Sequence, residues 1–242
     1  MASRPPPREQ SGDPSPVAFS LRGFLRGARR ALTLAPGDLA VGLLFGVLSK
    51  QAGLSLGEAI LMSAVVNAGS SQFVAVGMWG APVPVIPIVA TTLLVNLRHV
   101  LMGLTIRPWL SRVPAWQRYP AAFVLTDESW AMSMVEFEDG RPDIAFLVGV
   151  GATMYAGWLI ATVVGRLTGA VIHDPARWGL DFAFVAVFLA LLTSLARGWR
   201  SVPPWILAGA AAIAANRLLP GNWYVLVGAA AGCVPAALRS PR

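Results

Sequence analysis

Long apolar runs without charge dominate the pattern of residues along the chain. Residues 59–97, 144–165 and 218–238 contain no charged side chain. Each run has at least the roughly 20 residues that a membrane-spanning helix needs, and the first is long enough for two. The pattern therefore predicts an all-α integral membrane protein.

Roughly eight apolar segments are long enough to cross a membrane fully or in part. Pro82 and Pro84 divide the longest uncharged run, because proline lacks an amide hydrogen and clashes with the preceding turn. A tight hairpin is therefore expected near residues 79–84. We also expect at least one segment to be broken in the middle of the membrane. The expected segments are 32–52, 58–80, 84–106, 119–136, 143–168, 181–197, 203–219 and 222–238.

Composition supports the membrane assignment. The chain is 55% apolar and 13% charged, with a mean hydropathy of +0.61, whereas ordinary soluble domains are about 25% charged. The net charge of +7 rests on arginine, and six arginines fall in the first thirty residues. A basic end beside apolar spans marks a cytoplasmic flank near anionic lipid rather than a nucleic-acid-binding surface. We expect a multi-pass protein of the cell (inner) membrane with a cytoplasmic N-terminus.

The distribution of charge between segments leaves the topology open. Eight spans place both ends in the cytoplasm, which suits the N-terminal arginines, Arg197 with Arg200, and Arg239 with Arg242. The same arrangement places basic residues outside and an acidic stretch inside, against the positive-inside bias. A re-entrant segment among the first three would reconcile these loops but would move the C-terminal arginines outside. The conflicting residues are Arg107, Arg112, Arg118, Glu136, Glu138 and Asp139.

The chain divides into one large apolar domain and short flanks. Residues 1–16 are rich in proline, serine and charge and are expected to be a disordered tail without a secretory signal. Residues 17–31 form a basic interfacial approach or an ordinary solvated entry to the first span. Residues 32–238 form a single polytopic transport domain, and residues 239–242 form a C-terminal tail.

Two polar clusters interrupt the first two segments. A polar or charged side chain in hydrocarbon costs roughly 3 kcal/mol, so such residues are functional candidates. Asp38 lies either about one turn inside its segment or at a capped helix start. Residues 67–72 (NAGSSQ) cannot all face one neighbouring helix, so a local break is expected, with freed backbone groups available to a polar substrate. The alternative is close helix packing through small residues.

Two further clusters carry charge into the third and fourth segments. Arg98 follows Asn96 and requires an acidic partner or a substrate carboxylate at this depth. His99 can carry a proton or hold a structural hydrogen bond. Asp127 and Glu128 lie in the centre of the fourth segment, about 100° apart on a helix, and either pairs naturally with Arg98. The alternative is a short amphipathic helix outside the membrane.

The sequence offers no motif for catalysis, metal or cofactor binding. Cys233 is the single cysteine, and neither His99 nor His173 has companions at metal-ligand spacing. The phosphate-binding pattern GxxxxGK and the zinc pattern HExxH are absent. The spacing GxSxG occurs once, as GLSLG at 53–57, but it lies between two expected membrane segments and not at the strand-to-helix turn of a nucleophile elbow. We therefore expect no metal, no cofactor and no enzymatic activity.

Four motifs, in order, resemble the AzlC family, the large subunit of branched-chain amino-acid exporters. They are LMSAVVNAGSSQF at 61–73, NLRHVLMG at 96–103, LTDESWAM at 125–132 and GLDFAFVAVFLALL at 179–192, and the opening PGDLAVGLLFGVLSKQAGLS at 36–55 also fits. Four motifs in the same order are more specific than any one of them alone. The resemblance extends over roughly residues 30–238.

The resemblance implies secondary, proton-coupled export of branched-chain or related apolar amino acids (Leu, Ile, Val, Met), together with a small membrane subunit of the AzlD type. The expected coupling residues are His99, Asp127 and Glu128. The alternative is a non-transporting assembly or regulatory subunit whose ion pairs are structural. The residues expected to bind substrate are Gly69, Ser70, Ser71, Gln72, Asn96 and Arg98.

Overall fold

The computed structural model describes residues 17–169, 189, 202–219 and 223–238, and in these residues all regular elements are helices. This confirms the all-α membrane fold. Outside the described residues lie the expected tails, segment 181–197 and its motif at 179–192 except for residue 189, His173, and the arginines at 197, 200, 239 and 242. The side chain of Cys233 is likewise not described. The helices are α1 (Leu21–Ala31), α2 (Ala35–Gln51), α3 (Leu56–Val66), α4 (Gly69–Gly77), α5 (Val85–Leu110), α6 (Ala115–Phe123), α7 (Asp127–Glu138), α8 (Ile144–Thr168), α10 (Val202–Leu218) and α11 (Trp223–Leu238).

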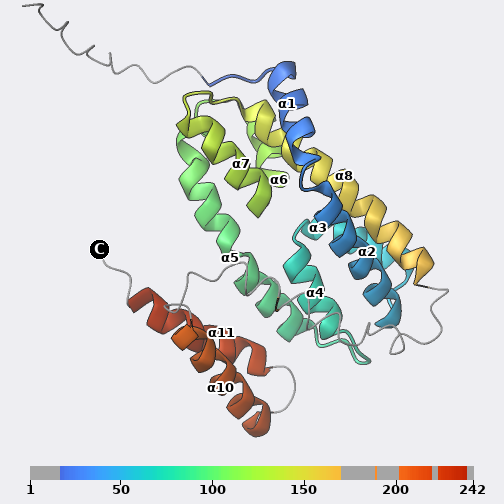
Figure 1. Cartoon of the computed structure of the whole chain (residues 1–242). Coiled ribbons are helices and arrows are strands. Elements are labelled where there is room, and N and C mark those ends of the chain that lie inside the picture. The colour runs from blue at the N-terminus through green and yellow to red at the C-terminus, as the bar shows by residue number, and fades with distance from the viewer. Residues whose placement is uncertain (1–16, 170–188, 190–201, 220–222, 239–242) are drawn as a thin grey trace, which may run out of the picture.

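The other seven expected segments each coincide with a helix or a broken pair of helices. α5 and α8 are each long and apolar enough to cross a membrane, and α1 with α2 forms a third candidate span that is bent by 67°. The expected hairpin connects α4 to α5 through Pro82 and Pro84. In Figure 1 the pair α10 and α11 lies beside α5.

Helix α8 is the scaffold against which α1 and α2 pack in succession (Figure 1). Asp143 caps its first turn by accepting from the Ala145 amide at 3.0 Å, and the same carboxylate accepts from the Ser20 hydroxyl at 2.5 Å. The N-terminus of α1 is thereby fixed to the N-terminus of α8. Glycines then allow the backbones to approach closely: Gly27 lies against the Phe146 carbonyl and Gly165 against the Leu43 carbonyl.

We expect Gly165→Leu to destabilise the protein, because a β-carbon there would overlap the backbone carbonyl of Leu43 on α2. The cost should lie at the upper end of overpacking, about 3 kcal/mol. The measurement is membrane abundance together with thermal unfolding in detergent. Gly103→Leu on α5 is the matched control, since no heavy atom lies within 4 Å of its β-carbon position. Equal stability of the two variants would contradict the prediction.

The helix break expected at residues 67–72 is confirmed, and it falls at Asn67 and Ala68. Asn67 adopts a left-handed conformation, with φ 43° and ψ 37°, which ends α3. The side-chain amide of Asn67 donates to the Phe123 carbonyl at 3.0 Å, and the Tyr155 hydroxyl donates to the Ala64 carbonyl at 3.0 Å. Backbone carbonyls at the ends of two helices thus find side-chain donors, as an apolar environment requires.

The expected fourth segment, 119–136, is wrong as a continuous helix. It is divided into α6 and α7, and Asp127 and Glu128 open α7 instead of lying in the middle of a span. The cause is a reciprocal cap: the Thr126 hydroxyl accepts from the Ser129 amide at 3.3 Å, and the Ser129 hydroxyl accepts from the Thr126 amide at 2.8 Å. Two broken helix pairs, α3–α4 and α6–α7, therefore face each other.

Two residues of the acidic stretch that conflicts with the positive-inside bias, Glu136 and Asp139, pair with arginine. Glu136, near the end of α7, has a side chain that is 2% exposed. Its Oε1 lies 3.1 Å from Nη1 of Arg30 on α1. Its Oε2 lies 3.7 Å from Nη2 of Arg26 on α1 and 3.6 Å from Nε of Arg141 in the loop before α8. The acidic stretch and the N-terminal arginines consequently occupy the same end of the molecule.

Candidate functional site

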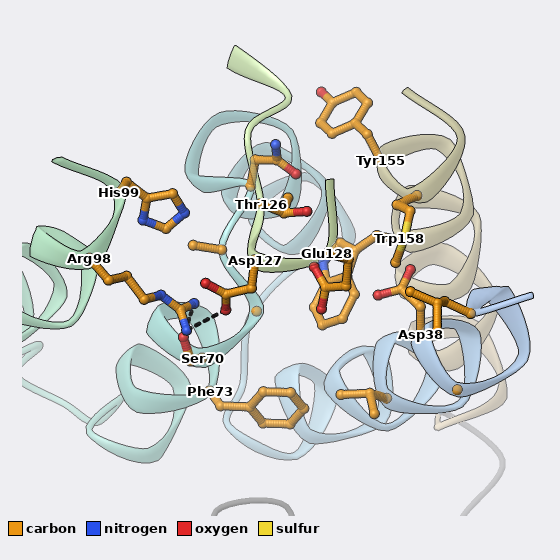
Figure 2. Close-up of a pocket in the computed structure, with 17 residues that line it drawn as sticks. Asp38, Ser70, Phe73, Arg98, His99, Thr126, Asp127, Glu128, Tyr155 and Trp158 are labelled. Carbon is orange, nitrogen blue, oxygen red and sulfur yellow. Dashed lines mark hydrogen bonds and ion pairs between the residues drawn. The ribbon is translucent and has the colours of Figure 1, made fainter. Parts of the chain in front are cut away.

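A cavity of about 310 Å³ lies where the two helix breaks meet α2, α5 and α8 (Figure 2). Its volume is at the lower end of the roughly 300–1,000 Å³ typical of small-molecule sites. Charged groups of both signs share the lining with apolar side chains. The lining residues are Leu34, Gly37, Asp38, Val41, Asn67, Ala68, Gly69, Ser70, Phe73, Arg98, His99, Thr126, Asp127, Glu128, Met154, Tyr155 and Trp158.

The start of α4 forms one wall of the cavity. The first amides of a helix have no intrahelical acceptor, and Ala68 supplies no side-chain cap. The positive end of the helix dipole is therefore directed to this region, where Gly69 and Ser70 line the cavity. Gly69 also packs against the six-membered ring of Trp158, and a side chain at this position would overlap that ring.

Arg98 reaches from α5 to both helix starts. Its Nη1 lies 2.6 Å from Oδ2 of Asp127, and its Nη2 donates to the Ser70 hydroxyl at 2.8 Å (Figure 2). Both partners of the ion pair remain partly open, with 35% of the Arg98 side chain and 48% of the Asp127 side chain exposed. The pair expected from the sequence is formed, and it connects α4, α5 and α7.

Two carboxylates line the cavity without forming an ion pair among the described residues. Asp38 projects from α2 and Glu128 from α7 (Figure 2), and among the described residues neither forms an ion pair or a hydrogen bond through its carboxylate. Asp38 is thus a cavity residue, which the expected site did not include. The sequence signal for Asp38 was its position within an apolar segment. That signal alone did not distinguish a cavity-lining residue from a helix cap.

Three residues expected to bind substrate lie behind the cavity wall instead of lining it. The Ser71 hydroxyl donates to Oδ1 of Asn96 at 2.6 Å, which holds α4 against α5. Gln72 is fully buried and donates to the Ser63 hydroxyl at 3.0 Å, and Ser63 lies 3.0 Å from the Thr162 hydroxyl on α8. These bonds fix the frame around the cavity.

His99 lines the cavity, and its Nδ1 lies 3.3 Å from the Asn96 carbonyl. Tyr155 and Trp158 line it from α8, and Phe73 from α4; the expected site included none of these. Tyr155 and Trp158 are three residues apart in an uncharged run, a spacing that places them on one helix face. No group of three or more His, Cys, Asp or Glu side chains suited to a metal occurs in the described part of the chain.

These features define a helical membrane protein with a partly open cavity of mixed charge between two broken helix pairs. Such breaks are typical of transporters, which bind substrates with the backbone groups of discontinuous helices. The family described as AzlC protein matches residues 33–172, which is more than half of the sequence. The chain belongs to the AzlC family.

Relatives extend the match over most of the chain. An "Uncharacterized membrane protein" of Archaeoglobus fulgidus is 30% identical over 86% of this chain and 92% of its own length. "Inner membrane protein YgaZ" of Escherichia coli is 26% identical over 96% of each chain. "Branched-chain amino acid transport protein AzlC" of Bacillus subtilis is 25% identical over 64% of this chain and 61% of its own. No solved structure matches.

Proposed function

We propose that this protein is the large subunit of a secondary, proton-coupled exporter of branched-chain or related apolar amino acids. It works in the cell membrane, with its N-terminus in the cytoplasm, together with a small membrane subunit of the AzlD type. Leucine, isoleucine, valine and methionine are the substrates we propose. Membership of the AzlC family and the name of the Bacillus subtilis relative support the transport of branched-chain amino acids.

The observation that carries the proposal is the mixed character of the cavity. Apolar walls from Val41, Phe73 and Met154 suit an aliphatic side chain. Arg98 and the free amides of α4 suit a carboxylate, and the cavity carboxylates suit an ammonium. A neutral zwitterion with an apolar side chain is the small molecule that satisfies all three features.

Proton coupling has its candidates in the same cavity. His99, Asp127 and Glu128 line it, so a change in their protonation is felt directly by a bound substrate. Asp127 already pairs with Arg98. A proton arriving at Asp127 would release Arg98 for a substrate carboxylate, which couples the two events without a long relay.

The function is tested by efflux of preloaded radiolabelled leucine, valine and methionine from cells that make this chain, with and without a small AzlD-type subunit. We expect efflux at least about tenfold above background with both subunits, strong inhibition by a protonophore, and weak efflux from the chain alone. Absence of efflux from the pair would refute export. Full efflux from liposomes that hold only this chain would refute the need for a partner.

The ion pairs favour a second candidate, a non-transporting assembly or regulatory subunit. Arg98 with Asp127 and the arginines around Glu136 connect separate helices, which a structural role alone explains. This candidate predicts unchanged efflux in any variant that keeps the fold. Variants that reach the membrane in normal amounts but no longer export would exclude it.

A further inference from the structure

Two buried donors at the cavity have no acceptor within the described part of the chain. Trp158 is 8% exposed, its indole extends from α8 into the cavity (Figure 2), and its Nε1 forms no hydrogen bond among the described residues. The Nε of Arg98 is likewise buried without an acceptor there. An unsatisfied buried donor costs about 1–3 kcal/mol, so both groups indicate a ligand that brings acceptor oxygens.

The same cavity also contains two carboxylates that lack a partner cation among the described residues. Asp38 and Glu128 face it from different helices with no cation among the described residues, while Arg98 is already engaged with Asp127 and Ser70. Two like charges on one small cavity repel each other, and a shared cation between them removes that repulsion. The carboxylates therefore favour a ligand that brings positive charge.

We propose that Asp38 and Glu128 bind the ammonium group of a substrate α-amino acid, and that the indole of Trp158 donates to its carboxylate. This assignment rests on the proposed function. An α-amino acid carries both charged groups on one carbon, so a single molecule satisfies the donors and the carboxylates together. The assignment makes Glu128 a substrate ligand and adds Asp38 and Trp158, which no motif of the sequence had indicated for this role.

The test is isothermal titration of the full-length protein in lipid nanodiscs with three probes that share one isobutyl group. L-leucine carries both charged groups, 3-methylbutylamine carries the ammonium alone, and 4-methylpentanoate carries the carboxylate alone. We expect each analogue to bind at least about tenfold more weakly than leucine, because a charge-assisted hydrogen bond is lost on one side.

Three variants separate the two halves of the site. Asp38→Asn should weaken leucine and 3-methylbutylamine at least about tenfold and leave 4-methylpentanoate within about twofold. Trp158→Phe keeps an aromatic ring but removes the N–H together with the second ring of the indole. A selective loss, with leucine and 4-methylpentanoate weakened and 3-methylbutylamine spared, therefore marks the N–H as the group that binds the carboxylate. Glu128→Gln should repeat the Asp38→Asn pattern. Asp139→Asn is the matched control, because Asp139 pairs with Arg141 away from the cavity.

The outcomes separate this site from the function on which it rests. If the wild-type protein binds none of the three probes, the proposed function and the site are both wrong. If the wild-type protein binds leucine but Asp38→Asn and Glu128→Gln weaken none of the probes, or weaken all three alike, the ammonium assignment is wrong and amino-acid export stands. The crossed pattern of Asp38→Asn and Trp158→Phe supports the assignment.

Discussion

Asp127→Asn is expected to reduce leucine efflux at least about tenfold, because it removes the partner of Arg98 in the cavity. A fully buried pair would lose on the order of 3–5 kcal/mol of stability when one partner is removed. Arg98 and Asp127 are both partly open to the cavity, so screening should lower the cost to about 1–2 kcal/mol. Activity should therefore fall much further than membrane abundance.

The double variant separates a working pair from a structural one. Arg98→Gln with Asp127→Asn removes both charges of this pair, so neither partner is left stranded and membrane abundance should return to near the wild-type amount. Efflux should stay low, because the cavity then lacks the cation for the substrate carboxylate and the acid that releases it. Asp139→Asn again serves as the control. Wild-type efflux in both single variants would refute the network, and restored efflux in the double variant would leave a structural bridge.

The ion pair could be predicted because the argument is energetic and does not depend on detailed geometry. An arginine within an apolar segment needs an acid, and the nearest segments offered Asp127 and Glu128. In the structure, Asp127 is the residue that pairs with Arg98. The cap formed by Thr126 and Ser129 starts α7 at Asp127, so Asp127 reaches Arg98 while Glu128 lines the cavity without an ion pair among the described residues. That selection depends on where the helix starts, which the apolar pattern did not resolve.

The roles of residues 67–72 could be predicted in part. Their composition indicated a break, and the break is present. Once α4 starts at Gly69, successive residues turn by about 100°, so the stretch cannot line the cavity throughout. Gly69 and Ser70 line it, whereas Ser71 and Gln72 turn into the frame and bond to Asn96 and Ser63. All four residues are small or polar, so the sequence did not distinguish those that line the cavity from those that hold its frame.

Asp38 shows what local pattern leaves undetermined. Its own segment is compatible with a capped helix start as well as with a buried position. Its place in the cavity depends on α2 packing against α8 through glycine, so that the first turn of α2 faces the start of α7. That contact joins residues far apart in the sequence, and it follows from the tertiary arrangement.

The last prediction concerns Glu136, the buried carboxylate at the other end of α7, whose three arginine partners have side chains that are 45–54% exposed. The two sides of this cluster should respond unequally. Glu136→Gln frees arginines that water can solvate, so it should cost about 1 kcal/mol. The triple variant of Arg26, Arg30 and Arg141 to glutamine instead strands a carboxylate that is 2% exposed, which should cost on the order of 3–5 kcal/mol. Adding Glu136→Gln to the triple variant should restore most of the lost stability, because the stranded charge is gone.

Thermal unfolding in detergent and membrane abundance measure the stability of all three variants. Glu138→Gln, two residues further along the chain and in no ion pair within the described residues, is the matched control. If Glu136→Gln alone destabilises as much as the triple variant, or if the combined variant recovers nothing, the burial of Glu136 is not what makes the arginines necessary.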